Sequence, residues 1–224
     1  MQASSLEIIS NQSDIHEHLE EIVQKHLATD FQKPISAHTQ AVFDRLNEQV
    51  LQSQKPVILD SCCGVGESTQ HLAELYPDAL VIGLDKSACR LAKHDALSSH
   101  NYVLERVDLN DFWRLVAQAQ WPVYKHYLLY PNPWPKSKHI RRRWHGAAVF
   151  PALLQIGGQL ELRSNWKLYL EEFQYALHQA GFMDTTFNAF QTEHPMTPFE
   201  RKYQLSAHTL WQLQVDLSSQ VRSR

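Results

Sequence analysis

The sequence predicts an α/β fold, in which helices flank a mostly parallel sheet of seven strands and an antiparallel strand closes the sheet. Two observations lead to this prediction. Short apolar runs alternate with helical patterns from residue 57 to residue 180, as in repeated strand and helix units whose strands are buried on both faces. The first apolar run ends in a turn that contains Gly64 and Gly66, and the second ends in Asp85. Because parallel α/β sheets bind ligands beyond such strand ends, the pattern also indicates a binding site.

Chain length and composition fit one folded domain with a short leading segment. The 224 residues are 43% hydrophobic and 20% charged, which excludes fibrous and wholly disordered chains. The formal net charge of -3 argues against a general nucleic-acid coat protein. We expect residues 1–54 to form an N-terminal arm and helices that pack on the core. Residues 55–217 should form the main domain and residues 218–224 a C-terminal tail. We expect the first dozen residues and this tail to be the loosest parts.

The sequence also disfavours several classes of protein. No apolar run approaches the roughly 20 residues of a membrane helix, and the first residues lack the basic and apolar regions of a signal peptide, so we expect a cytoplasmic protein without membrane contact. Cys62 and Cys63 are adjacent and Cys89 stands alone, which gives neither a disulfide framework nor a zinc motif. The histidines and acids near the start lack the H-E-x-x-H spacing, so we expect no metal.

Two helices are expected ahead of the sheet. Ser13 and Asp14 are typical of a helix start, and apolar residues then recur at helical spacing up to residue 29. The same spacing predicts a second helix over residues 38–52, and Pro56 then leads into the first strand.

The elements of the main domain follow from the alternation of patterns. Apolar runs predict strands at residues 57–60, 80–85, 102–107, 127–130 and 159–162. Helical spacing predicts helices at residues 68–75, 87–97, 111–119, 142–154 and 166–180. Two further segments are expected to supply the closing antiparallel pair, at residues 185–190 and 210–217.

Glycines and acids converge on the carboxyl edge of the predicted sheet. Gly64 and Gly66 let the backbone pass close to a ligand because no Cβ stands in the way. Asp85, roughly 20 residues further on, is suited to accept hydrogen bonds from ribose hydroxyls. Asp60 and Asp108 end the first and third strands at the same edge. The arrangement favours a ligand that contains adenosine, although an ordinary tight turn would explain the two glycines alone.

The acid at the end of the first strand decides which adenosine ligand fits. A dinucleotide fingerprint reads G-x-G-x-x-G, whereas the turn here lacks the third glycine and begins with Asp60, which would repel a pyrophosphate. A carboxylate instead favours a nearby positive charge. The ammonium and sulfonium groups of S-adenosylmethionine would therefore suit Asp60.

Residues 60–66 resemble the acid-x-G-x-G-x-G pattern of class I methyltransferases, which have a Rossmann-like α/β fold. The resemblance implies that Asp85 holds the ribose and that Asp108 lies near the adenine. Cys62 stands in the first glycine position, where it either narrows the space around the methionine part of the cofactor or marks a backbone with an ordinary φ. The implied cofactor residues lie at one edge of the sheet: Asp60, Cys62, Gly64, Gly66, Asp85, Asp108 and Asn132.

The most distinctive segment of the sequence is residues 130–143, directly after the fourth predicted strand. Its prolines fix the backbone, which would hold Asn132 and Trp134 rigidly, and a basic cluster suited to phosphate contacts follows. Each part also has a simpler explanation. Trp134 is compatible with a packing aromatic, and the three consecutive arginines at 141–143 with the solvated start of a helix.

Three motifs in order resemble the tRNA (guanine-N7)-methyltransferases. Residues 130–143 resemble their F-P-D-P-W-x-K-x-x-H-x-x-R-R segment, residues 165–166 resemble a later D-W pair, and residues 197–200 resemble their T-x-F-E motif. Together with the glycine turn, the likeness covers roughly residues 55 to 217.

The resemblance implies transfer of a methyl group from S-adenosylmethionine to N7 of a guanine in tRNA. Independently of the resemblance, we expect a monomer or a homodimer. Asn132 would be the catalytic residue and, with Asn165, would orient the guanine. Thr197 and Glu200 would grip the edge of the base. The remaining substrate residues would contact bases or phosphates: Trp134, Lys136, Arg141, Arg142 and Arg143.

Two departures from the family bear on the chemistry. Asn132 and Asn165 stand where the family carries Asp. Guanine N7 has a free lone pair and no proton to lose, so alignment matters more than a general base. A carboxylate at about 4 Å would nevertheless stabilise the positive charge reaching the purine by up to ~4 kcal/mol at an effective dielectric constant of 20. Two alternatives therefore stay open: a changed acceptor, such as an exocyclic amine or a small molecule, and a catalytically silent RNA-binding homologue.

Overall fold

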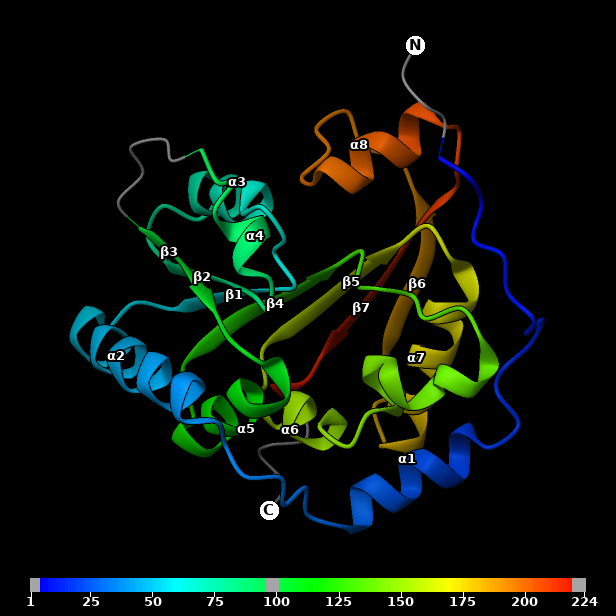
Figure 1. The fold of residues 1–224 in the computed structure, drawn as a ribbon, viewed down its shortest axis with the longest axis horizontal. Coiled ribbons are helices and arrows are strands. Elements are labelled where there is room, and N and C mark those ends of the chain that lie inside the picture. The colour runs from blue at the N-terminus through cyan, green and yellow to red at the C-terminus, as the bar shows by residue number, and fades with distance from the viewer. Residues whose placement is uncertain (1–4, 96–100, 219–224) are drawn as a thin grey trace.

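A computed structural model describes residues 5–95 and 101–218, and its centre is a seven-stranded sheet in the order β3-β2-β1-β4-β5-β7-β6 (Figure 1). Strands β1 to β5 are parallel, whereas β7 runs antiparallel to both of its neighbours, β5 and β6. The predicted mostly parallel sheet of seven strands with an antiparallel closing strand is confirmed. The strands are β1 (Val57–Ser61), β2 (Leu80–Asp85), β3 (Tyr102–Arg106), β4 (Val123–Leu129), β5 (Gln159–Ser164), β6 (Thr185–Phe190) and β7 (Leu210–Asp216).

Helices cover both faces of this sheet, and the two faces have separate cores. On one face, apolar side chains of α1, α2, α5, α6 and α7 pack on the sheet, and on the other face α3 does so. The α-helices are α1 (Leu19–Ala28), α2 (Ala37–Ser53), α3 (Glu67–Leu75), α4 (Ala88–Leu91), α5 (Leu109–Ala119), α6 (Phe150–Gln155), α7 (Lys167–Gln179) and α8 (Pro198–Leu205). Two 3₁₀ helices, η1 (Ser137–Arg142) and η2 (Trp144–Gly146), lie between β4 and α6.

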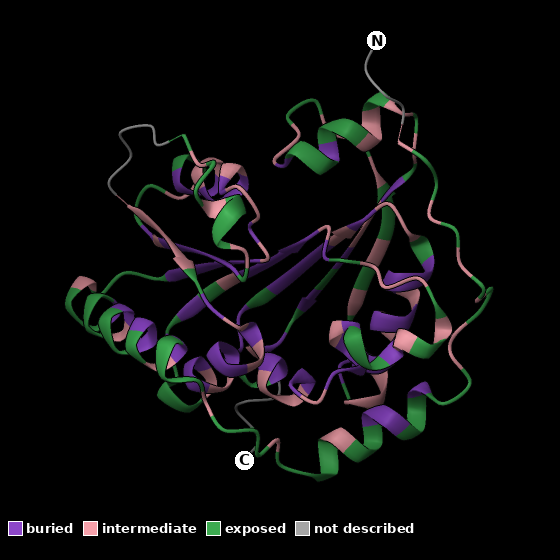
Figure 2. Cartoon of the chain, in the orientation of Figure 1, coloured by how far each residue is buried: buried purple, intermediate pink, exposed green. Residues whose placement is uncertain are grey.

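The central strand β1 shows why an apolar run forms this sheet. Val57 and Leu59 point into one core and Ile58 into the other, and all three are fully buried. A strand covered on both faces has no solvated side, which accounts for its continuous apolar sequence. Figure 2 shows the same pattern, with buried residues along the central strands and exposed residues on the outer sides of α1 and α2. The leading helices bury Leu19 and Leu46 against the first core.

Several element boundaries differ from the prediction. The first helix begins at Leu19 instead of residue 14, and β4 begins at Val123, four residues before the predicted start at 127. The helix expected at residues 87–97 is only the short α4, and its predicted last residues, 96 and 97, lie outside the described residues. Helix α8 was not predicted as an element.

The predicted helix over residues 142–154 is confirmed only from Phe150 onward, where α6 begins. The chain there forms the end of η1, the whole of η2 and then α6, with Pro151 in the first turn of α6. Arg143 and His145 both bind the buried carboxylate of Glu172 on α7. These tertiary contacts hold the segment in short turns that helical spacing alone does not reveal.

Residues 5–16, here called the N-terminal arm, run in an extended course along one side of the molecule from α8 to α1 (Figure 1). The expectation that the first dozen residues are loose does not hold for residues 5–12, because Ser5, Ser10 and Gln12 hydrogen-bond to distant parts of the chain. Of the predicted tail, the structure describes only Ser218, whose hydroxyl accepts from the Gly158 amide at 3.0 Å. Within residues 5–95 and 101–218, no helix combines the length and apolar character of a membrane span.

Candidate active site

A cavity of about 870 Å³ lies at the carboxyl ends of the central strands, where parallel α/β sheets bind ligands. One side follows β1, β2 and β3 and is here called the glycine side: Cys62, Cys63, Gly64, Val65, Asp85, Lys86, Arg90 and Asp108. The other side is formed by the proline loop, residues 130–137, and by neighbouring segments: Tyr130, Asn132, Trp134, Arg141, Arg142, Thr197 and Phe199.

The two glycines of the turn differ in what surrounds them. Gly64 has a φ of +63°, and a Cβ built there would meet no atom within 4 Å, so its backbone faces open space. Gly66 has a φ of +82° and precedes the first residue of α3. A Cβ on Gly66 would lie only 2.5 Å from the Leu104 Cδ1 atom. Gly64 therefore keeps the cavity open, whereas Gly66 does not line the cavity and is favoured chiefly by its left-handed φ, because the Leu104 side chain could shift to admit a Cβ.

Cys62 keeps a left-handed backbone although it is not a glycine. Its φ is +66°, which costs an L-residue roughly 1–2 kcal/mol. The alternative that this position has an ordinary φ is therefore wrong, and the Cys62 side chain lines the cavity. Burial, followed by the nearby charge of Asp85, raises the pKa of the Cys62 thiol to about 12. The thiol that lines the cavity is therefore uncharged at physiological pH.

Asp85 is a buried carboxylate that organises the glycine side. Its Oδ1 atom accepts from the Ser87 amide at 2.7 Å, and its Oδ2 atom accepts from the Gly64 amide at 3.0 Å. The guanidinium of Arg90 lies 3.4 Å from the same Oδ2 atom. The strand end and the glycine turn are therefore held together by the residue that the sequence predicts to bind a ribose.

Asp108 is partly exposed and begins α5 as its N-cap. Its Oδ1 atom accepts from the backbone and side-chain amides of Asn110. Partial burial alone would raise the pKa of Asp108, but the Asn110 hydrogen bonds and the charges of Lys86 and Lys33 hold this pKa below its usual value. Asp108 is therefore ionised over the whole physiological range.

Asp60 lies behind the cavity and does not line it. The carboxylate is fully buried, and its Oδ2 atom accepts from the hydroxyls of Ser68 at 2.6 Å and Thr69 at 2.7 Å. Its Oδ1 atom has no hydrogen-bond partner among the described residues. Burial raises the pKa of Asp60 to about 6. A buried carboxylate with an unpaired oxygen is costly, and a cation brought near it would offset that cost.

The proline loop carries two residues with positive φ, Tyr130 at +49° and Trp134 at +47°. The Asn132 Oδ1 atom accepts from the Trp134 amide at 3.3 Å, which closes a small turn at the exposed tip of the loop. The Arg142 guanidinium stacks over the Trp134 ring at 4.7 Å from its centroid. Arg141 and Arg142 are exposed on the cavity rim, so this side is cationic and aromatic.

Four predicted substrate residues do not line the cavity: Lys136, Arg143, Asn165 and Glu200. Arg143 is fully buried and pairs with Glu172, so it supports the proline loop from behind in place of the expected exposed phosphate contact. Lys136 is exposed at the end of the proline loop. Asn165 is half-buried, and its amide lies 3.2 Å from the His208 Nδ1 atom.

Thr197 and Glu200 start helix α8. The Thr197 hydroxyl accepts from the Glu200 amide at 2.9 Å, as an N-cap does, and Thr197 also lines the cavity. Glu200 is fully buried, where its carboxylate accepts from the Tyr130 hydroxyl at 2.8 Å, the Met196 amide at 2.6 Å and the Arg163 guanidinium at 3.0 Å. Glu200 therefore fixes the proline loop against α8 and faces away from the cavity.

Comparison with known proteins decides the family. A family described as "Putative methyltransferase" matches residues 54–213, which is well over half of the chain. The chain belongs to this methyltransferase family. The resemblance predicted from the three motifs is confirmed by relatives named tRNA (guanine-N(7)-)-methyltransferase. One from Nitrosococcus oceani is 29% identical, with 77% of this chain and 73% of the relative covered. One from Ectopseudomonas mendocina is 28% identical, with 74% of each chain covered.

Solved structures support the same fold. The methyltransferase matches the 16S rRNA methyltransferase KamB with a TM-score of 0.56 and 16% identity, over 82% of this chain and 94% of that one. It matches a further antibiotic-related methyltransferase with a TM-score of 0.55 and 14% identity, over 82% and 96% of the two chains. At these identities the likeness establishes the fold alone.

Several cavity residues of the methyltransferase were not predicted from sequence, among them Lys86, Arg90 and Phe199. Lys86 and Arg90 follow Asp85 closely and add positive charge to the glycine side. Phe199 lies within the T-x-F-E motif, is 48% exposed and stacks on Tyr203, with ring centroids 6.1 Å apart. The signal for Phe199 was present, since it is a large aromatic inside a motif. Arg90 left no such signal because its role depends on the turn of α4. Within the described ranges, no group of three metal-ligating side chains occurs.

Proposed function

We propose that this methyltransferase transfers the methyl group of S-adenosylmethionine to N7 of a guanine in tRNA. The observation that carries the proposal is one cavity whose glycine side presents carboxylates and an open backbone, and whose other side presents aromatic and cationic residues. The first set suits an adenosine-containing cation, and the second suits a base on a polyanionic chain. The names of the curated relatives support the same reaction.

The glycine side fits the proposed cofactor. Gly64 leaves space where any other residue would place a Cβ, and Asp85 offers acceptors for ribose hydroxyls. We assign Asp108 to the adenine end. Cys62 would border the methionine part, and the unpaired Oδ1 atom of Asp60 would favour its positive charge from behind the turn. When bound, S-adenosylmethionine supplies an electrophilic methyl group.

The proline loop would position the acceptor base. The ring of Trp134 and the exposed ring of Phe199 both line the cavity, and each offers an apolar face for stacking. Arg141 and Arg142 lie on the rim, where phosphates of the RNA would approach. Guanine N7 has a free lone pair, so these residues need to align the base and to exclude water, without removing a proton.

Asn132 is the residue that we propose to face the reacting base. Its amide contributes a dipole where relatives of this motif carry a carboxylate, so the positive charge that reaches the purine receives less stabilisation. Thr197 would contact the edge of the base, with Glu200 holding the start of α8 behind it. Asn165 does not line the cavity, so we propose that it affects the position of the base indirectly, through its contact with His208.

The direct test incubates the purified protein with methyl-labelled S-adenosylmethionine and an unmodified tRNA transcript, followed by nucleoside analysis. The proposal predicts label in 7-methylguanosine, and the variant Asp85→Ala should abolish it. Label in another nucleoside, or only in small molecules from a metabolite extract, would replace the proposal with a changed acceptor. Cofactor binding without transfer to any of these would identify a silent RNA-binding homologue.

A second acceptor is favoured by one observation, the amide at position 132 in place of an acid. Replacing Asn132 with Asp distinguishes guanine N7 from an exocyclic amine as the acceptor. If N7 is the acceptor and the missing charge limits the rate, Asn132→Asp should raise kcat at least tenfold, within the bound of ~4 kcal/mol for a charge pair at an effective dielectric constant of 20. An unchanged or lower kcat for guanine, together with transfer to an exocyclic amine, would support the changed acceptor.

A further inference from the structure

Contacts behind the proline loop connect it to the start of the chain. We propose that Ser10, Asn11 and Gln12 of the N-terminal arm, together with the buried Arg143–Glu172 pair, are positioning residues that hold the proline loop in the shape needed for methyl transfer. This inference rests on the proposed function and adds to it a set of positioning residues that lie outside the cavity. None of these five residues lines the cavity.

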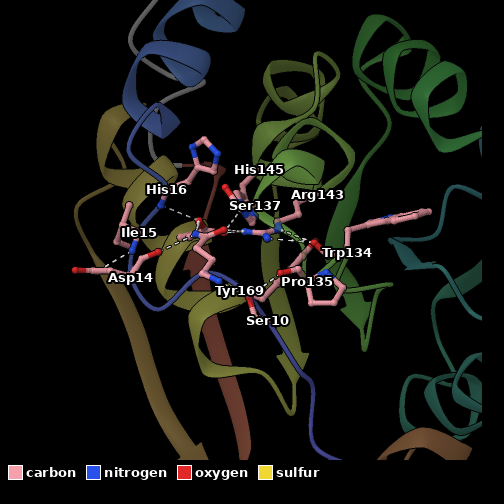
Figure 3. Close-up of polar contacts among 12 residues, drawn as sticks. Ser10, Asp14, Ile15, His16, Trp134, Pro135, Ser137, Arg143, His145 and Tyr169 are labelled. Carbon is pink, nitrogen blue, oxygen red and sulfur yellow. Dashed lines mark hydrogen bonds and ion pairs between the residues drawn. The ribbon is translucent and has the colours of Figure 1, made fainter.

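The arm binds the proline loop directly at two points. The Ser10 hydroxyl donates to the Pro135 carbonyl at 2.6 Å, and the Ser137 amide donates to the Asn11 Oδ1 atom at 3.0 Å. Figure 3 shows Ser10 and Pro135 side by side at the edge of the loop. A proline carbonyl and a backbone amide are both fixed groups, so these bonds constrain the course of the loop and not just one side chain.

A second set of contacts reaches the middle of the loop from behind. The Arg143 Nε and Nη2 atoms both donate to the Trp134 carbonyl, at 3.2 and 3.1 Å. The Nη1 atom of the same guanidinium pairs with Glu172 and donates to the Gln12 Oε1 atom at 3.1 Å. Arg143 thus joins three segments that are far apart in sequence, and Figure 3 shows it pointing at the backbone of Trp134.

The carboxylate of Glu172 anchors the arm as well as the arginine. Its Oε1 atom accepts from the Gln12 side chain at 2.5 Å and from the His16 amide at 3.0 Å, and His145 lies 3.1 Å from its Oε2 atom. Partial desolvation alone would raise the pKa of Glu172, but the hydrogen bond and charge of His145 and the charge of Arg143 lower it to about 2. The pair therefore stays ionised at every pH at which the enzyme would work.

The loop needs such support because its backbone is strained. Trp134 has a φ of +47°, a conformation that a bulky residue keeps only where the surroundings impose it. The buried Arg143 donates to the Trp134 carbonyl, while Arg142, which lines the cavity, stacks on the Trp134 ring. The neighbouring arginines therefore have different roles: one faces the acceptor and the other fixes the residue against which it stacks.

The other end of the arm reaches the second asparagine of the site. The Ser5 amide donates to the Ser206 hydroxyl at 2.8 Å, and the Ser5 carbonyl lies 3.0 Å from the His208 Nε2 atom. The Nδ1 atom of His208 in turn lies 3.2 Å from the Asn165 amide. The arm thus extends from His208, which lies beside Asn165, to the proline loop. It therefore contacts the residues that support Asn165 as well as those that support the loop.

The test uses the arm, because removing Arg143 would leave the Glu172 charge buried without its cation and would destabilise the whole fold. The double variant Ser10→Ala/Asn11→Ala removes both direct bonds to the loop. Ile9→Ala is the matched control, since Ile9 is 87% exposed in the same arm. A conservative pair, Ser10→Thr/Asn11→Asp, retains a donor and an acceptor. Each protein is assayed for kcat and KM on tRNA, for S-adenosylhomocysteine affinity, and for amide exchange over residues 131–139.

The proposal predicts a 10- to 100-fold loss of kcat in the alanine pair, since a misplacement of about 1 Å can cost that much. Cofactor affinity should stay within twofold, exchange in the loop should accelerate, and the Ile9 and conservative variants should match the unmodified protein. An unchanged kcat with unchanged exchange would overturn the proposal, as would a loss of kcat accompanied by an equal loss of cofactor affinity. If the unmodified protein methylates no tRNA, the proposed function fails, and amide exchange alone then decides whether the arm holds the loop.

Discussion

On the glycine side of the cavity, the functional groups hold one another through local bonds, as in the 3.0 Å contact between the Gly64 amide and the Asp85 carboxylate. The proline loop, in contrast, is held through Arg143, which binds the Trp134 carbonyl and is itself bound by Gln12 of the arm and Glu172 of α7. The glycine side is therefore held mainly by the βα units that form it, with Lys33 and Thr39 as outside contacts to Asp108. The shape of the proline loop depends on tertiary contacts that span most of the chain, so the two sides should respond differently to substitution.

The difference separates residues that face a ligand from residues that hold those residues in place. On the glycine side, Asp85 performs both tasks, because it binds the turn and lines the cavity. At the proline loop the tasks are divided between Arg142 at the rim and Arg143 in the core. A motif therefore shows which residues gather at a site, whereas burial shows which of them can touch a substrate.

The largest effect should come from Asp85→Ala. Two hydrogen bonds from ribose hydroxyls to a charged acceptor, each contributing about 1.5–3 kcal/mol, would be lost, so affinity for S-adenosylhomocysteine should fall at least 100-fold by calorimetry. Affinity for tRNA should stay within twofold if the two sides are independent. The exposed Asp78→Ala serves as the control. A parallel loss of tRNA affinity in Asp85→Ala would show that the sides are coupled.

Asp60→Asn should show how the buried Asp60 carboxyl, behind the glycine side, makes the free energy of unfolding depend on pH. Its pKa rises from 3.8 in the unfolded chain to about 6 in the folded protein, so the folded state holds the proton more tightly. The wild-type protein should therefore lose stability as pH rises from about 4 to 6, by about 3 kcal/mol at 1.36 kcal/mol per pKa unit, and the variant should lose less.

Urea unfolding of both proteins at pH 4 and pH 7.5 checks this prediction. The free energy of unfolding of Asp60→Asn should exceed that of the wild type at pH 7.5, and the gap should shrink towards pH 4. A gap that does not change with pH would mean that the Asp60 carboxyl titrates normally in the folded protein. Asp78→Asn is a suitable surface control.

At the proline loop, Trp134→Ala should weaken binding of the acceptor alone. Stacking of a base on an aromatic ring contributes about 1–3 kcal/mol, so the KM for tRNA should rise roughly tenfold or more. Affinity for S-adenosylhomocysteine should not change, and Trp134→Phe should retain most of the binding. An unchanged KM for tRNA would indicate that Trp134 packs against Arg142 without contacting RNA.

The smallest effect is expected for Arg142→Ala. Loss of one phosphate contact should reduce the slope of log affinity for tRNA against log salt concentration by about one unit. Lys55→Ala, at the opposite edge of the sheet just before β1, should leave the slope unchanged. Equal slopes for the Arg142 variant and the wild type would place the phosphate contacts elsewhere on the surface.

The sequence predicted the fold well, and it predicted that Cys62, Gly64, Asp85 and Asp108 gather at one cavity, because both depend on local patterns. Asp60 and Gly66, which were predicted with them, do not line that cavity. Buried strands such as β1 appear as apolar runs, and the turn at Gly64 appears as glycine followed by a distant acid. Arg143 was misread because its partner, Glu172, lies 29 residues further on, and three consecutive arginines resemble a solvated surface. The sequence left the backbone conformation of Cys62 open, because a left-handed φ at a cysteine depends on the turn and not on the residue type.

The central claim is that the acceptor atom is guanine N7, and removing that atom tests it most directly. Two transcripts of one tRNA are compared, the first with guanosine and the second with 7-deazaguanosine, which has carbon in place of N7. The account predicts methyl transfer to the first transcript and none to the second, with equal binding of both. Equal transfer to the two transcripts would contradict it, because the methyl group would then have reached another atom.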